Sequence, residues 1–232
     1  MRTSVATGAA VSSAPVPVRV PYDELAPQMA TGDVILMHGT FSLSRAIQFI
    51  ERSYWTHSGF VVRGEDVGLG DEVLFWESNS DPIADVRFGT DKPGPMLDSL
   101  RQRIVYAVTS TGDMDFAWRK LTVDRTPADV TALWDLMPTV HEAGFPNDLT
   151  MLFDWLMGKW FGVHTSEKKI FCAELVAKTY QTIGWLPSDR PPNAFCPRDF
   201  SAAGNLALLQ GATLGPEVHI APPPPPPPTV KQ

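Results

Sequence analysis

Residues 57–77, HSGFVVRGEDVGLGDEVLFWE, place two apolar runs on either side of an acidic turn that contains glycine. The runs at 58–62 and 73–76 are short and rich in β-branched and aromatic residues, which predicts two strands. The glycines and acids between them favour a turn, so the segment is expected to form a β-hairpin. A symmetric pairing of its two halves makes His57 and Glu77 cross-strand neighbours on one face, with Cβ atoms about 5 Å apart.

A carboxylate at that distance can orient an imidazole, and the pair would form half of a catalytic triad. The alternative is a surface histidine and glutamate at a strand end. A register shift of one residue would place the two side chains on opposite faces of the sheet.

A nucleophile is available further along the chain in Cys172, in the first turn of a helix predicted at 171–183. Free N–H groups at a helix start stabilise a thiolate and lower the pKa of a thiol. Leu175, Val176 and Thr179 follow the cysteine at helical spacing, so Cys172 is expected on the packed face. The alternative is a buried core cysteine. The second cysteine, Cys196, follows Phe195 in a loop and is expected to be structural or partly exposed.

The rest of the chain supports one α+β domain with a small antiparallel sheet. Turn, capping and periodicity signals predict strands at 34–37 and 103–108 and helices at 41–52, 127–143 and 148–159. Pro138 is expected to kink or divide the second of these helices. The third is expected to present an apolar face made of Leu149, Leu152, Phe153, Leu156 and Trp160.

Both ends differ in composition from the middle. We predict a disordered arm at 1–21, a domain at 22–215 and a proline-rich tail at 216–232. The tail holds seven consecutive prolines at 222–228. Such a run favours polyproline II and is typical of a solvated tail, a stiff spacer or a ligand for an aromatic-groove domain.

Composition excludes several classes of protein. Among 232 residues there are two cysteines, too few for a disulfide framework. The formal net charge of −7 argues against a nucleic-acid partner. No apolar run is long enough for a membrane span and no secretory signal is evident, so we expect a cytoplasmic protein with reduced thiols and no integral membrane segment. No HExxH or paired CxxC spacing occurs, so no metal or other cofactor is expected.

Four segments together resemble a known family. They are Gly32-Asp33-Val34-Ile35, Tyr54-Trp55-Thr56-His57-Ser58-Gly59, Trp76-Glu77-Ser78 and Phe171-Cys172-Ala173-Glu174-Leu175-Val176. In this order they are similar to the permuted papain-like amidases of the YaeF/YiiX type, relatives of NlpC-type endopeptidases and of lecithin:retinol acyltransferase. The resemblance implies a circularly permuted papain-like (NlpC-like) fold, because the cysteine helix follows the histidine strand instead of preceding it.

The resemblance also implies roles for single residues. Cys172 would be the nucleophile, His57 the general base and Glu77 the orienting acid. The backbone N–H of Cys172 is one candidate donor to the oxyanion, and the side chain of Tyr54 is another. Asn147 stands where the family often has tyrosine, so the substrate preference is expected to differ.

The expected activity is that of a cysteine hydrolase, amidase-like or thioesterase-like, or of an acyltransferase. It would act on an amide or ester bond through an acyl-thioester on Cys172. A small-molecule or lipid acyl substrate fits, such as an acyl lipid or an N-acyl amino acid, because the segment 133–161 is rich in aromatic residues and methionine that suit an acyl-binding groove. Two alternatives stay open: a catalytically silent papain-like binding module and a peptidoglycan endopeptidase.

Overall fold

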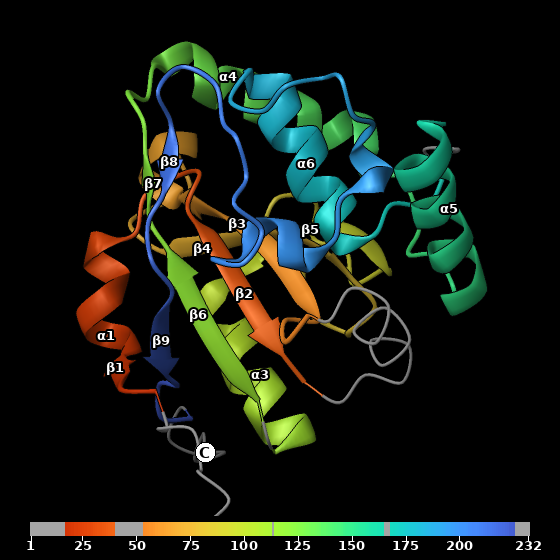
Figure 1. The fold of residues 1–232 in the computed structure, drawn as a ribbon. Coiled ribbons are helices and arrows are strands. Elements are labelled where there is room, and N and C mark those ends of the chain that lie inside the picture. Colours follow the sequence, from red (N-terminus) through yellow and green to blue (C-terminus); the bar gives the residue numbers. More distant parts are fainter. Residues whose placement is uncertain (1–16, 40–52, 113, 165–167, 226–232) are drawn as a thin grey trace, which may run out of the picture.

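A computed structural model describes residues 17–39, 53–112, 114–164 and 168–225. The predicted helix at 41–52 and the last three residues of the proline run therefore lie outside the described residues. The elements form a mixed α/β arrangement in which helices lie on both sides of one large sheet (Figure 1).

The main sheet has seven strands in the order β1-β9-β6-β2-β3-β4-β5. Their bounds are β1 Arg19–Pro21, β2 Val34–His38, β3 His57–Arg63, β4 Val73–Asn79, β5 Gly94–Ser99, β6 Asp115–Arg119 and β9 Val218–Ala221. All neighbours pair antiparallel except β1 and β9, which pair parallel. The sequence predicts a small antiparallel sheet. The observed sheet is larger than predicted, because β1 and β9, from the two ends of the chain, extend it. A separate two-stranded sheet joins β7 (Leu121–Thr122) to β8 (Thr213–Leu214).

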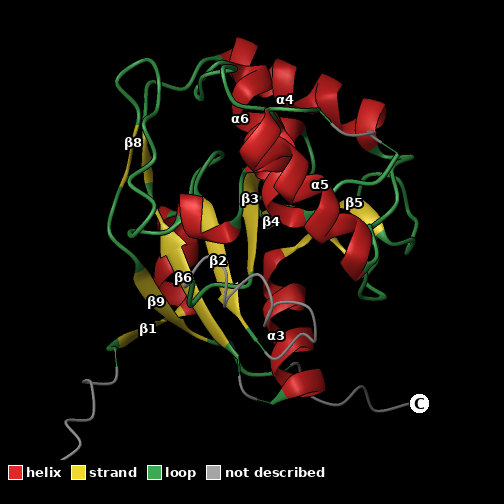
Figure 2. Ribbon diagram, turned by 45° about the vertical axis from the view of Figure 1, so that its right-hand side comes forward, coloured by secondary structure: helices red, strands yellow, loops and turns green. Residues whose placement is uncertain are grey.

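Alternate residues of the strands supply two apolar layers, as expected for a sheet covered on both faces. One layer joins Leu36, Phe60 and Trp76 to helices α4 (Pro127–Val140) and α6 (Cys172–Ile183). The other joins Ile35, Val61 and Phe75 to α1 (Tyr22–Leu25) and α3 (Leu100–Thr111). Figure 2 shows α4 and α6 together on one side of the sheet and α3 on the other. Short 3₁₀ turns lie at Ala26–Gln28 (η1), Gly64–Val67 (η2), Pro192–Ala194 (η3) and Pro197–Phe200 (η4).

The predicted strand at 103–108 is wrong, because this segment belongs to helix α3. Ser99 caps the helix by accepting a hydrogen bond from the N–H of Gln102. The buried residues of the helix, Leu100, Arg103, Ile104 and Ala107, follow the i, i+3, i+4, i+7 spacing of one helical face. Burial of this face against the sheet outweighs the strand preference of the β-branched residues.

Helices α4 and α6 follow their predicted signals closely. Thr126 and Asp129 form a reciprocal capping box at the start of α4, and the helix runs past Pro138 before ending at Val140. At the end of α6, Gly184 adopts the left-handed conformation that favours glycine.

Helix α5 (Asp148–Phe161) forms where expected but turns a different face inward. Phe153 and Trp160 are 59% and 69% exposed, whereas Trp155 is buried. The orientation is set by Gly158, at which a Cβ would lie 2.6 Å from the side chain of Asn193. The helix therefore packs through its small residue, and two of the predicted core aromatics face solvent.

The predicted domain boundaries are too narrow at both ends. The arm at 1–21 includes β1, and the tail at 216–232 includes β9. Val20 lies opposite Ile220, and Ile220 is fully buried in the apolar layer that includes residues of α1 and α3. Because burial of one short strand by the other stabilises both, the domain extends at least over 19–221. Among the described helices, none is long and apolar enough to cross a membrane.

Candidate active site

The hairpin that the sequence predicts is present, with its register shifted by two residues. Phe60 pairs with Trp76, and the ladder between β3 and β4 ends there. A shift of two residues keeps every side chain on its face. His57 and Glu77 therefore still meet: Nε2 of His57 hydrogen-bonds to Oε2 of Glu77. Gly59 makes the approach possible, because a Cβ there would lie 2.3 Å from the ring of Phe75.

Glu77 is fully buried, and its remaining oxygen is held from two sides. Oε1 accepts a hydrogen bond of 2.6 Å from Nε of Arg103 on α3 and another from the side-chain amide of Asn79. Burial alone would raise the pKa of Glu77, but the positive charges of Arg103 and His57 and their hydrogen bonds lower it to about 2. Glu77 is thus an anion with a fixed orientation at any ordinary pH.

Cys172 is the first residue of α6 and is buried beside β3. It is the second polar partner of His57, after Glu77. Its sulfur hydrogen-bonds to the His57 side chain and to the backbone N–H groups of Ser58 and Ala173. Burial alone would raise the pKa of the thiol, but the charge of His57 and these hydrogen bonds lower it below its usual value. The β3–β4 ladder extends only from Phe60 to Arg63 on β3, so it does not use the N–H of Ser58.

The pKa of the His57 imidazole is raised, whereas that of the Cys172 thiol is lowered. Burial alone would lower the pKa of the imidazole, but the charges of Cys172 and Glu77 and the hydrogen bonds to both raise it to about 10. Since Nε2 faces Glu77, the other ring nitrogen, Nδ1, is left for the sulfur. At neutral pH the arrangement favours a thiolate beside an imidazolium.

Two further hydrogen bonds hold the cysteine helix against β4. Nε1 of Trp76 donates to Oγ1 of Thr179 at 3.1 Å, and Oγ of Ser78 donates to the carbonyl of Ile170 at 2.6 Å. Both side chains lie on the α6 face of the strand that carries Glu77 on its opposite face. The same strand therefore positions the acid and the nucleophile.

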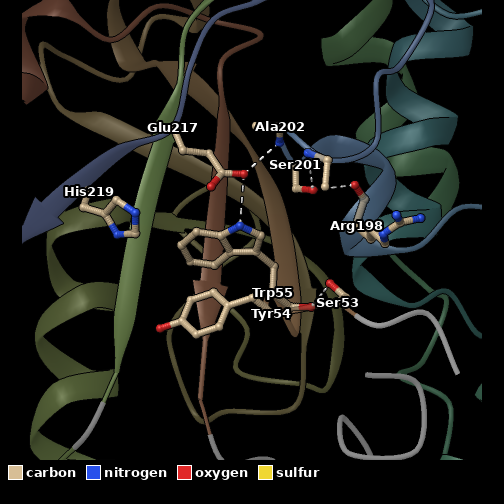
Figure 3. A pocket seen from close by; sticks show the side chains of 9 residues that line it. Ser53, Tyr54, Trp55, Arg198, Ser201, Ala202, Glu217 and His219 are labelled. Atoms are coloured by element: carbon tan, nitrogen blue, oxygen red, sulfur yellow. Dashed lines mark hydrogen bonds between the residues drawn. The ribbon is translucent and has the colours of Figure 1, made fainter. Parts of the chain in front are cut away.

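Tyr54, the predicted side-chain donor to the oxyanion, is directed elsewhere. Its hydroxyl donates to Oδ2 of Asp115 on β6 at 3.0 Å, and its ring stacks on His38. The residue lines a separate cavity of about 410 Å³ with Trp55, Glu217 and His219 (Figure 3). The prediction for Tyr54 is therefore wrong, because the carboxylate of Asp115 holds its hydroxyl two strands away from β3.

Three buried residues near Glu77 were not predicted as site residues from the sequence: Asn79, Asp98 and Arg103. Arg103 was hidden by the strand assignment, although helical spacing from Ser99 would have turned it inward with Leu100 and Ile104. Asn79 follows Glu77 at the next position on the same face of β4 and could have been found by alternation. Asp98 carries no local signal.

Within the residues that the structure describes, no group of three or more histidine, cysteine, aspartate or glutamate side chains is placed to hold a metal ion.

Comparisons with known proteins give little. No family model matches the chain, and no curated protein matches it in sequence. Among solved structures, the chain is similar to a crystal structure of metalloprotein YiiX from Escherichia coli O157:H7, with a TM-score of 0.43 and 19% identity over 85% of this chain and 99% of that one.

Proposed function

We propose that this protein is a cysteine hydrolase or acyltransferase that acts on an amide or ester bond through an acyl-thioester on Cys172. The observation that carries the proposal is the continuous series of buried contacts from Cys172 through His57 to Glu77. A nucleophile next to a base that a third group orients is the arrangement used for covalent acyl transfer.

Acylation follows from the positions of these groups. The thiolate of Cys172 attacks the carbonyl carbon of the substrate, and the carbonyl oxygen takes up the negative charge. The first-turn N–H of Cys172 is our proposed donor to that oxygen, since the first N–H groups of a helix have no partner within it. The His57 imidazolium then gives its proton to the departing nitrogen or oxygen as the bond to carbon breaks.

Deacylation uses the same groups in reverse. Neutral His57 takes a proton from water, or from the hydroxyl or amine of an acceptor, which attacks the thioester carbonyl. The C–S bond breaks, the thiolate of Cys172 returns, and His57 is again an imidazolium. Glu77 keeps its charge throughout and stabilises the cationic form of the ring.

The permuted papain-like fold is part of this proposal. Supporting it are the chain order, with the histidine strand before the cysteine helix, and the packing of α6 on β3 and β4. The proposed substrates are small-molecule or lipid acyl compounds. Support comes from the apolar layer around Cys172, which includes Leu133, Met137 and Trp155 of the predicted groove segment.

Trapping the acyl-enzyme tests the function. The full chain is incubated with 4-nitrophenyl acetate and 4-nitrophenyl palmitate, and separately with a cell lipid extract and with a peptidoglycan digest. Intact-protein mass spectrometry is expected to show an acyl adduct that maps to Cys172 and is absent from Cys172→Ala. The matched control, Cys196→Ala, should keep the adduct.

The outcome also decides between the alternatives. A muropeptide adduct would indicate the endopeptidase. Absence of any adduct, together with a Cys172 alkylation rate no faster than that of an ordinary thiol, would refute catalysis and leave the silent binding module.

A further inference from the structure

Asp98 is a fully buried acid in the layer behind the proposed active site. It lies on β5 opposite Phe75 of β4, and Glu77 pairs with Met96 two residues away. Directly opposed residues share a face of the sheet, and so do alternate residues of one strand. Asp98, opposite Phe75, therefore lies on the same face as Glu77. The side chain therefore sits beside the carboxylate that holds His57, one layer further from the cysteine.

Within the described part of the chain, the carboxyl oxygens of Asp98 accept no hydrogen bond from an N–H or O–H group, and Nη1 of the nearby Arg103 is likewise unpartnered. The side chain in hydrogen-bonding contact with it is the carboxyl group of Glu77. Two carboxyl groups can form such a bond only if one of them holds a proton.

The proton belongs to Asp98 and not to Glu77. Glu77 accepts hydrogen bonds from His57, Asn79 and Arg103, and all three favour its ionised form. Asp98 has none of these, and Asp85 adds a second nearby negative charge. Burial raises the pKa of Asp98 well above its usual value, and the charge of Glu77 raises it further, against the opposing effect of Arg103.

We propose that Asp98 is a positioning residue for the chemistry at Cys172: a neutral carboxylic acid whose O–H donates to Glu77 and holds that carboxylate in line with His57. This inference rests on the proposed function for its purpose. The contact itself does not depend on any substrate.

The experiment compares two substitutions that keep the branched arrangement of side-chain non-hydrogen atoms, Asp98→Asn and Asp98→Leu. Asparagine carries a neutral N–H donor in place of the O–H, whereas leucine has no donor. The readout is the pH profile of Cys172 alkylation by iodoacetamide in the Cys196→Ala background. Asp98→Asn is expected to keep the wild-type profile, and Asp98→Leu to move it toward higher pH, with a rate about tenfold lower near pH 6.5. Equal shifts in both variants would overturn the proposal.

A second measurement examines the proton itself and needs no reactive cysteine. Folded Asp98 keeps a proton that the unfolded chain loses above about pH 4, so its contribution to stability is complete below that pH and declines as pH rises. Asparagine does not titrate. The urea midpoint of Asp98→Asn should therefore rise relative to wild type between pH 4 and pH 7.

These results separate the two proposals. A pH-independent difference in urea midpoint would show that Asp98 is ionised and would refute its proposed role, even if Cys172 is acylated. A rising difference with the Asn and Leu profiles as expected would confirm Asp98 as a positioning residue for the thiolate, even if no acyl adduct forms on Cys172. If Asp98→Leu does not fold, the alkylation profile and urea series of Asp98→Asn decide.

Discussion

The two cysteines of this protein are alike in burial and in their position at the start of a helix. Both are buried and both lie at a helix start: Cys172 is the first residue of α6, and Cys196 directly precedes η4. They differ in their contacts. The Cys172 sulfur meets His57, whereas at Cys196 the backbone pairs with Asp199: the N–H of Asp199 donates to the carbonyl of Cys196 at 2.9 Å.

The comparison shows that a helix start does not by itself make a nucleophile. At Cys196 the local hydrogen bonds close on themselves, since the Asp199 carboxylate also accepts the N–H of Cys196 at 2.8 Å. At Cys172 the sulfur is linked to an imidazole that a buried carboxylate holds. The charge on that imidazole is what separates a structural thiol from a candidate catalytic one.

The largest difference is expected when each sulfur is removed. Cys172→Ala should lower turnover of the substrate identified by acyl trapping by at least about a thousandfold, because no other group can form the thioester. Cys196→Ala should stay within severalfold of wild type in the same steady-state assay. Equal losses in both variants would show that the cysteines act through the fold and not through chemistry.

Removing the base should bring Cys172 close to the behaviour of an ordinary buried thiol. His57→Gln takes away the positive charge that lowers the thiol pKa, so alkylation near pH 6.5 should slow about a hundredfold. The rate is measured with iodoacetamide in the Cys196→Ala background. A rate unchanged from the parent would mean that α6 alone activates the sulfur.

Neutralising the acid should affect both reactivity and stability. Glu77→Gln removes the carboxylate that accepts from Nε of the buried Arg103 and leaves that guanidinium its ion pair with Asp81. The expected loss in the free energy of unfolding is about 3 kcal/mol, measured with urea at pH 7. The double variant Glu77→Gln/Arg103→Met should recover stability but not the low thiol pKa. Recovery of both would assign Glu77 to the fold alone.

The contribution of Glu77 to stability should also depend on pH. Its pKa in the folded protein is about 2, below the ordinary value of 4.5, so the stabilisation is present above about pH 4.5 and is lost as pH falls toward 2. The difference in urea midpoint between wild type and Glu77→Gln should shrink over that range. A constant difference would contradict a buried glutamate anion.

The smallest effect is expected at the structural cysteine. Cys196→Ala removes a buried sulfur from the apolar layer, and the loss of its packing contacts is expected to cost about 1 kcal/mol. The free energy of unfolding is measured with urea, with the reactivity of Cys172 as the internal control. A stability loss that also slows Cys172 would show that η4 supports the site.

Much of the site is visible in the chain because its signals are local. The strand pair 57–63 and 73–79 follows from two apolar runs and a glycine turn, and α6 follows from its spacing and from Gly184. The predicted contact between His57 and Glu77 is present although the predicted register was wrong by two residues, since such a shift keeps both side chains on one face. Predictions made with similar rules were wrong where burial against other elements determined the structure. Examples are the helical conformation of α3 and the choice of the buried face of α5.

The sequence by itself determined the hairpin, the helix that begins at Cys172 and the order of the residues proposed for catalysis. Only the tertiary structure decided the seven-stranded sheet, the withdrawal of Tyr54 toward Asp115, and the group of Asn79, Asp98 and Arg103 around Glu77. The physical reason is that strand pairing at the chain ends, and the pKa values of buried groups, depend on contacts between residues far apart in the sequence. Periodicity and turn chemistry record only contacts between near neighbours.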